Sequence, residues 1–148
     1  MVKIEYIAGL VDGEGYIRIA KNKYRLSGKR NPTYQLYVGI NMTDPRPIKS
    51  IQEIFGGKIY VTRIKTSKHR TLFGWIVTSR KAIEFITAVR PHLLVKGEEA
   101  DVAITFQNHI DSSGRQWSAH KGLPKSVIDF RESLFQEISH LKHVQHEI

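Results

Sequence analysis

Apolar residues change their spacing abruptly near the start of this chain, and that change restricts the fold more than any other feature. From Ile4 to Val11 they fall at positions 4, 7, 8, 10 and 11, which is the spacing of one helix face. From Tyr16 onward they alternate with polar residues, as in a strand with one buried face. Gly13 and Gly15 lie at the junction and end the helical pattern. The chain is therefore predicted to open with a short helix that runs directly into a half-buried strand.

Two segments of the chain alternate in the manner of β-hairpins. In the first, residues 16–22 and 33–41 flank the turn-like segment SGKRNP. In the second, strands on either side of TSKHRT place Ile59 and Val61 on the same face as Trp75. The opposite faces carry mostly polar and aromatic side chains. Each hairpin is therefore expected to bury one face and expose the other.

Helices are predicted between and after the hairpins. Segment 43–57 combines Asp44 as a capping residue with prolines at the helix start and a Gly-Gly stop. Segment 111–125 has loop composition. Further helical patterns cover residues 79–93, 97–110 and 126–144. The predicted core order is helix, two strands, helix, two strands and helices, which is a mixed α+β fold.

Length and composition limit the class of protein. At 148 residues the chain is predicted to form a single domain over 1–148, with a core at about 4–110 and a carboxyl-terminal loop and helix at 111–148. It has no cysteine, which excludes disulfides and thiolate metal sites. No apolar run is long enough to cross a bilayer, and no secretion signal is recognisable. We expect a protein that works inside the cell, without contact with a membrane.

The charge distribution points to a polyanionic partner. The formal net charge is +9, and no Asp or Glu occurs between Gly15 and Thr43 or between Ile54 and Ile83. These two windows contain the two predicted hairpins, so one continuous basic surface is expected, and a surface of this kind attracts nucleic acid. Solvated basic faces on an unrelated domain are the alternative interpretation.

Residues 9–15 carry the most unusual chemistry. Gly9 and Gly13 are four residues apart, so they lie on one side of the first helix and allow another backbone to approach closely. Asp12 and Glu14 sit at the carboxyl end of that helix, where the helix dipole disfavours negative charge. A carboxylate at this position calls for a cation. The alternative is an ordinary surface glutamate at a helix end.

Residues 7–15, IAGLVDGEG, resemble the nine-residue signature of the LAGLIDADG homing endonucleases. Conservative changes stand at the first, fifth and seventh positions, and Glu replaces Asp at the eighth. The hairpin behind the signature, the GGKI exit of the second helix and the segment RPHLLVKGEEADVAI also resemble the family. Together these segments cover roughly residues 4–110. The resemblance implies an αββαββα fold whose antiparallel sheet forms a saddle in the DNA major groove, with extra carboxyl-terminal helices.

The resemblance also implies a homodimer. Family members with two signatures act as monomers and members with one act as dimers, and this chain has one. The signature helices would then meet at the two-fold axis with Gly9 and Gly13 in the dimer interface. Because a two-fold dimer reads matching half-sites, a long, imperfectly palindromic target is expected.

A dimer of this kind implies a metal site. It brings two copies of Glu14 to the axis, and like charges that close must protonate or bind metal. Mg²⁺, or another divalent cation, prefers oxygen ligands, so the Glu14 pair, backbone carbonyls near Gly13 and scissile phosphates are the expected ligands. Asp12 is expected to form structural hydrogen bonds instead.

Three further residues are candidates for catalysis. The family uses a lysine after its third helix to position or activate the attacking water, and Lys96 in LLVKGEE matches it; a solvated surface lysine is the alternative. The family's glutamine at the end of the second strand is replaced here by Met42. Neighbouring Asn41 substitutes for it if the strand end is bulged, and Arg46 is a candidate contact to the scissile phosphate or its water shell.

DNA reading is expected from the exposed faces of the two hairpins, because the opposite faces are buried. On these faces, arginine and glutamine are expected to pair with base edges, whereas lysine more often contacts phosphates. In the loop before the last helix, basic residues either contact the DNA backbone or pack within the loop. The candidates are Arg18, Asn22, Tyr24, Arg25, Thr33, Gln35, Tyr37, Lys58, Tyr60, Thr62, Arg70, Ile76, Thr78, Arg115 and Lys121.

The resemblance therefore implies a homodimeric, Mg²⁺-dependent hydrolase that makes double-strand breaks in DNA, as expected for intron homing. The alternative is a relative that has lost cleavage and binds DNA or RNA, either as an intron maturase that binds intron RNA or as a transcription regulator. Glu14 and Lys96 favour the enzyme, whereas Met42 favours the binding protein. An intein fragment lacks support, because the chain has no cysteine and no surrounding splicing domain.

Overall fold

The first helix of the protein leads straight into its first strand, as predicted. The computed structural model describes residues 2–22, 32–62, 70–113 and 122–147. Its elements, in chain order, are α1 (Ile4–Glu14), β1 (Gly15–Asn22), β2 (Thr33–Met42), α2 (Pro45–Phe55), β3 (Lys58–Thr62), β4 (Leu72–Thr78), α3 (Ser79–Val89), the 3₁₀ turn η1 (Arg90–His92), α4 (Gly97–Ser113) and α5 (Lys125–Leu141). The predicted order of helices and strands is confirmed.

The four strands form one antiparallel sheet in the order β1-β2-β4-β3. Each hairpin pairs as predicted, with Ile17 opposite Val38 in the first and Ile59 opposite Trp75 in the second. The two hairpins join through β2 and β4, which leaves β1 and β3 as the edges of the sheet.

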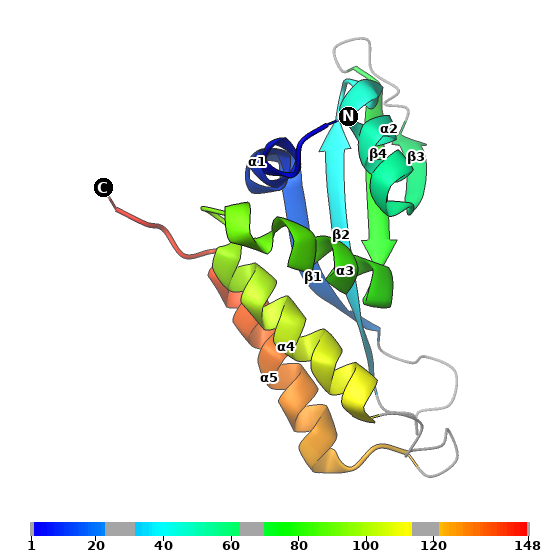
Figure 1. Ribbon diagram of the computed structural model, residues 1–148. Helices are drawn as coiled ribbons and strands as arrows, with labels where there is room; N and C mark the ends of the chain where they lie inside the picture. The colour runs from blue at the N-terminus through cyan, green and yellow to red at the C-terminus, as the bar shows by residue number, and fades with distance from the viewer. Residues whose placement is uncertain (1, 23–31, 63–69, 114–121, 148) are drawn as a thin grey trace.

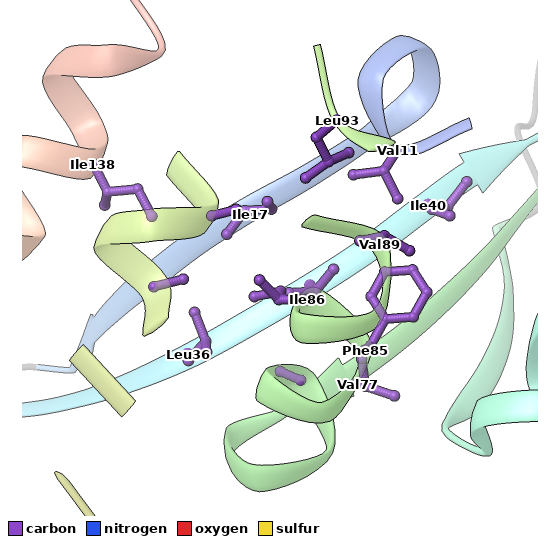
Figure 2. Packing of buried hydrophobic residues seen from close by; sticks show 14 of the residues in the cluster. Val11, Ile17, Leu36, Ile40, Val77, Phe85, Ile86, Val89, Leu93 and Ile138 are labelled. Atoms are coloured by element: carbon purple, nitrogen blue, oxygen red, sulfur yellow. The ribbon is translucent and has the colours of Figure 1, made fainter. Parts of the chain in front are cut away.

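The helices cover one face of the sheet (Figure 1). Inward side chains of the strands, such as Ile17, Leu36 and Ile40, are buried against Phe85 and Ile86 of α3. Figure 2 shows these side chains meeting between the sheet and the helices. Each such side chain contributes roughly 1.5–3 kcal/mol when fully buried, so the sheet is fixed with its opposite face outward.

The outward face carries no helix in the described part of the chain (Figure 1). Two tyrosines instead lie flat across glycines of the neighbouring strands. A Cβ atom at Gly39 would overlap the ring of Tyr16, and one at Gly74 would overlap the ring of Tyr60. Glycine is therefore needed at both positions, because the aromatic rings occupy the space that a side chain would fill.

Helix α2 begins and ends on the predicted residues. Asp44 is its N-cap and accepts a hydrogen bond from the backbone nitrogen of Arg46 at 3.0 Å, which satisfies a donor that the helix leaves free. At the other end Gly56 and Gly57 adopt positive φ angles of 72° and 91°. The indole nitrogen of Trp75 donates to the Gly56 carbonyl at 2.7 Å and fixes this exit.

The carboxyl-terminal helices pack antiparallel to each other beside β1 (Figure 1). Leu134 and Ile138 of α5 are buried in the core, and Glu132 binds the Lys21 ammonium at 2.9 Å and accepts a short hydrogen bond from Tyr34. No helix among the described residues is long and apolar enough to cross a membrane.

Candidate active site and nucleic-acid interface

Glu14 is the last residue of α1, and its side chain is exposed. Glycine is needed directly after it, because a Cβ atom on Gly15 would lie 2.8 Å from the Cα and carbonyl oxygen of Val11. The last turn of α1 contains no basic residue to offset the helix dipole. Within the described residues, the Glu14 carboxylate has no hydrogen bond or ion pair. It is therefore free to bind a cation from outside the chain.

Asp12, two residues earlier, is fully engaged. Its carboxylate accepts hydrogen bonds from the backbone nitrogens of Leu94, Val95 and Lys96 at 2.8, 3.1 and 3.0 Å. Hydrogen bonds to an ionised acceptor are about twice as strong as neutral ones. The predicted structural hydrogen bonding of Asp12 is confirmed, and it holds the loop before α4 against the end of α1.

This loop places Lys96 beside the signature. The Lys96 ammonium donates a 2.6 Å hydrogen bond to the backbone carbonyl of Asp12. A lysine ammonium has three N–H donors, so Lys96 has two further N–H groups to offer. The structure thus brings Lys96 to the end of the helix that carries Glu14, although the two residues are far apart in the sequence.

The end of β2 differs from expectation. The pairing of β2 with β4 is regular through Asn41 and Met42, so the bulge that would let Asn41 take the place of the family's glutamine is absent. Met42 faces the helices and packs against the core, whereas Asn41 faces outward. The Asn41 Oδ1 accepts a 2.7 Å hydrogen bond from the Tyr60 hydroxyl, so only its amide nitrogen remains free to donate.

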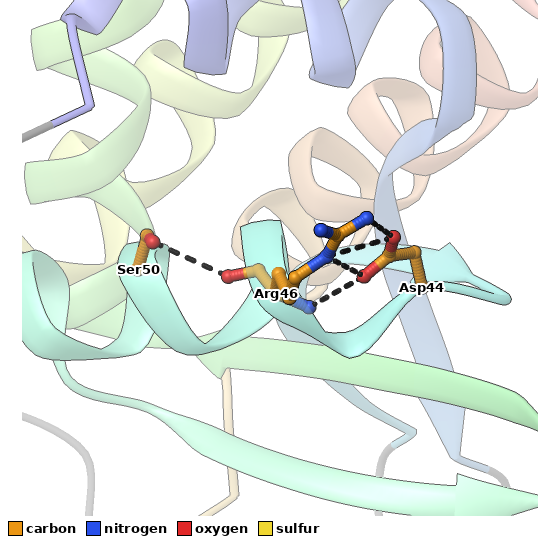
Figure 3. A network of polar contacts seen from close by, with 3 residues as sticks. All are labelled: Asp44, Arg46 and Ser50. Carbon is orange, nitrogen blue, oxygen red and sulfur yellow. Dashed lines mark hydrogen bonds and ion pairs between the residues drawn. The ribbon is translucent and has the colours of Figure 1, made fainter.

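Arg46 lies at the start of α2 and is bound by Asp44 (Figure 3). Its Nε atom is 3.0 and 3.1 Å from the two carboxylate oxygens, and these hydrogen bonds lower the pKa of Asp44 to about 2. Arg46 borders a groove with Tyr6 and Met42, beside the amino-terminal half of α1. In the described part of the chain, no hydrogen bond or ion pair joins it to Glu14 or Lys96.

Several of the predicted DNA-reading residues share the outward face. The Arg18 guanidinium carbon lies 5.6 and 5.1 Å from the ring centres of Tyr16 and Tyr37, close enough for cation–π attraction. Gln35 accepts from the Tyr37 hydroxyl at 3.0 Å and donates to Ser79 at 3.2 Å. The exposed candidates are Arg18, Asn22, Thr33, Lys58, Thr62 and Arg70, and the half-buried ones are Gln35, Tyr37, Tyr60, Ile76 and Thr78. Tyr24, Arg25, Arg115 and Lys121 lie outside the described residues.

Tyr16 is not among the predicted DNA-contacting residues, yet it has a central position on this face. Its pKa is raised to about 12, first by burial and then by the charge and hydrogen bond of Tyr60. Tyr16, Tyr60 and Asn41 therefore form one polar chain across the middle of the sheet. The sequence signal for it is a glycine at an outward position in each central strand, Gly39 and Gly74.

Gly9 and Gly13 are exposed on α1, and a Cβ atom at either would have no neighbour within 4 Å. Glycine costs roughly 1 kcal/mol relative to alanine inside a helix. Packing within the single chain therefore does not require glycine at these positions.

Comparison with known proteins identifies the family. The family model described as LAGLIDADG endonuclease matches residues 7–93, which include most of α1, the whole sheet and α3. The chain belongs to this LAGLIDADG family. A search of curated protein sequences gave no match. The predicted family resemblance is confirmed.

Solved structures of LAGLIDADG homing endonucleases share the fold. The structure of I-CvuI with its target and Ca superposes with a TM-score of 0.74 at 15% identity, covering 98% of this chain and 85% of that chain. The archaeal intron-encoded I-Vdi141I, complexed with DNA, gives 0.72 at 16% identity and covers 97% and 86%. I-AabMI bound to uncleaved DNA gives 0.61 at 22% identity, covering 90% of this chain and 44% of that longer chain. The predicted mixed α+β homing-endonuclease fold is confirmed.

Proposed function

We propose that this LAGLIDADG protein is a homodimeric endonuclease that acts inside the cell and cuts both strands of a long, pseudo-palindromic DNA target by metal-dependent hydrolysis. The observation that carries the proposal is the free Glu14 carboxylate at the end of α1, with Lys96 bound beside the same helix end. These residues occur on a fold whose solved relatives include complexes with DNA.

The proposal of a homodimer rests on the need for a second free carboxylate at the end of α1. One chain supplies one free carboxylate at this helix end, because Asp12 is engaged by three backbone N–H groups. A second copy packed against the exposed Gly9 and Gly13 would bring a second Glu14 to the same place. The glycines allow close approach of two helix backbones, which compensates for their unfavourable helix propensity.

The donor set suits a hard divalent cation. No group of three or more His, Cys, Asp or Glu side chains occurs among the described residues. In this proposal the metal ligands are shared between two chains. Two Glu14 carboxylates and carbonyls near Gly13 are oxygen donors, as Mg²⁺ prefers. When bound, the metal lowers the pKa of water and stabilises the leaving oxygen. I-CvuI, a relative in fold, has been crystallised with Ca and with Mg.

The chain's own residues have distinct roles in this proposal. Lys96, whose ammonium has donors to spare, orients the attacking water. The exposed sheet face binds the duplex, with Arg18 and Gln35 toward base edges and Lys58 toward phosphates. Asn41 contributes at most its amide nitrogen, because Tyr60 occupies its oxygen. Arg46 joins the reaction only if DNA draws it away from Asp44.

The proposal is tested with a library of randomised duplexes incubated with the protein and Mg²⁺, followed by sequencing of the cut ends. We expect enriched, two-fold related sequences and breaks in both strands. Glu14→Gln should retain binding to the selected duplex and lose cleavage by several orders of magnitude. Cleavage that survives this substitution, or that continues in EDTA, would contradict the proposed site.

The orientation of Met42 supports a second candidate, a nucleic-acid-binding protein without cleavage activity. An apolar side chain that faces the core cannot hold active-site water as the family's glutamine does. Under this alternative the protein binds duplex DNA or intron RNA in the presence of Mg²⁺ or Mn²⁺ and leaves it intact. The same library, scored for retention instead of cutting, separates the two candidates.

A further inference from the structure

A small cavity of about 180 Å³ lies at the free edge of β1, directly after Glu14. It is lined by Gly15, Tyr16 and Ile17 of β1, by Lys96 and Glu99 at the start of α4, and by Lys142 at the end of α5. The cavity therefore joins the signature region to the last helix of the chain, which lies outside the segment that the family model matches.

The packing of α5 fixes the position of Lys142. Because α5 runs antiparallel to α4, its carboxyl end lies beside the amino end of α4 (Figure 1). Ile138, one turn before Lys142, is buried in the core, and Glu132 anchors the helix to Lys21 and Tyr34. Lys142 therefore reaches the cavity from the end of a packed helix.

The charges around this cavity are unbalanced. Among the described residues, Lys96 and Lys142 line it together with one acid, Glu99, and Arg18 lies close enough to act on Lys142. Lys142 is exposed overall, and its pKa is lowered, first by partial desolvation of the ammonium against the cavity and then by Arg18, against the opposing effect of Glu99. In the described part of the chain the Lys142 ammonium has no hydrogen bond or ion pair. Clustered cations of this kind are stabilised by an anion.

We propose that Lys142 and Lys96 together bind one backbone phosphate of the DNA, next to the position at which the strand is cut. The cavity lies against Gly15 and Tyr16, the two residues that follow Glu14, so an anion in it is adjacent to the proposed site of cleavage. Lysine suits this task because its compact ammonium acts as a point charge toward phosphate. The inference rests on the proposed function and makes α5 part of the active site.

The test measures binding without cleavage. A fluorescent duplex of random sequence is titrated with wild type, Lys142→Ala, Lys96→Ala and the double variant, in EDTA and at several KCl concentrations. Lys125→Ala, an exposed lysine at the other end of α5, is the matched control. Each variant is first checked for an unchanged melting temperature.

We expect Lys142→Ala to lower the slope of log affinity against log salt by about 0.9, the value for one lost phosphate contact. The double variant should lose less affinity than the product of the two single losses, because both lysines hold the same phosphate. The affinity losses of Lys125→Ala and Lys96→Ala should instead multiply when these two substitutions are combined. Lys142→Arg should restore most of the affinity and Lys142→Gln should not.

Equal effects of Lys142→Ala and Lys125→Ala, or losses from Lys142 and Lys96 that simply multiply, would overturn the shared phosphate site. Because no metal is present, this result does not depend on cleavage. If the protein cuts no DNA but the effects of the two lysine substitutions on affinity are coupled, the proposed hydrolysis is refuted and the shared phosphate site is kept. If the protein cuts DNA but these effects are independent, the shared phosphate site is refuted and the proposed hydrolysis is kept. A wild-type protein that binds no duplex would refute both.

Discussion

Asp12 and Glu14 are two carboxylates within one helical turn, yet they have opposite environments. The side chain of Asp12 points at the loop before α4 and accepts three backbone hydrogen bonds, whereas that of Glu14 points to solvent. This division follows from helix geometry, since residues two apart lie on nearly opposite sides of a helix. One acid is therefore used for folding, and the other is available for chemistry.

Asp12→Asn should destabilise the protein by about 2 kcal/mol, because hydrogen bonds to a charged acceptor contribute roughly 1.5–3 kcal/mol in all. The measurement is urea unfolding followed by circular dichroism. Glu14→Gln is the matched control and should be neutral or slightly stabilising, since its charge opposes the helix dipole. An equal loss of stability in both variants would contradict the assignment of Asp12 as the structural residue.

Gly39 shows how one missing side chain can organise a sheet face. Gly39→Ala should cost about 1–3 kcal/mol, because the new methyl group must displace the Tyr16 ring and disturb its hydrogen bond with Tyr60. Gly9→Ala has open space around it and should instead stabilise the isolated chain by about 1 kcal/mol. Thermal unfolding of the two variants under dilute conditions checks both signs. A neutral Gly39→Ala would mean that Tyr16 does not lie over β2.

The strands were predictable because a period of two leaves little choice about which face is buried. The same alternation places Met42 inward, so sequence alone could have shown that its side chain faces the core. Helix ends were harder to predict. The helix expected over 79–93 ends at Val89 and continues as a 3₁₀ turn that contains Pro91, and its first residue, Ser79, has a positive φ of 52°. Proline removes a backbone donor, and that local effect outweighs the apolar pattern.

One carboxylate, that of Glu132, adds polar contacts between helix α5 and the sheet. The pKa of Glu132 is lowered to about 2, first by the hydrogen bond from Tyr34 and then by the one from Lys21. A pKa that is depressed by folding gives stability above the unfolded value, about 4.5, and this stability is lost as the pH falls toward 2. The contact of α5 with β1 and β2 should therefore weaken in acid.

Glu132→Gln should lower the free energy of unfolding by about 1–2 kcal/mol at neutral pH, in line with loss of charge-assisted hydrogen bonds. The difference from wild type should shrink between pH 4.5 and 2, because the wild-type carboxyl is then protonated too. Denaturant unfolding at a series of pH values measures it, with the exposed Glu137→Gln on the same helix as control. A difference that stays constant with pH would rule out the Glu132 charge as the cause.

In the molecule as a whole, helices cover one face of the sheet and leave the other face exposed. The inward face of the sheet is covered by helices, whereas no helix among the described residues covers the outward face, and a Cβ atom at Gly9 or Gly13 of α1 would meet no described atom within 4 Å. The sequence predicts both features. The two acid-free windows contain the hairpins, and Gly9 and Gly13 follow a helical spacing on α1. The cavity between Lys96 and Lys142 could not be foreseen, because it depends on how α5 packs against α4.

The stripe of α1 gives the last prediction. Gly13→Leu should raise the dimer dissociation constant by at least about tenfold, equivalent to 1.4 kcal/mol, because a leucine side chain keeps the two α1 backbones apart. Analytical ultracentrifugation over a range of concentrations measures this constant directly. Thr105→Leu adds the same side chain to an exposed position of α4 and should leave the dimer unchanged. Since a Cβ atom at Gly13 would meet no described atom within 4 Å, Gly13→Leu should still fold. A wild type that stays monomeric at every concentration, or a Gly13→Leu dimer as tight as wild type, would remove α1 from the interface and leave each Glu14 without its partner.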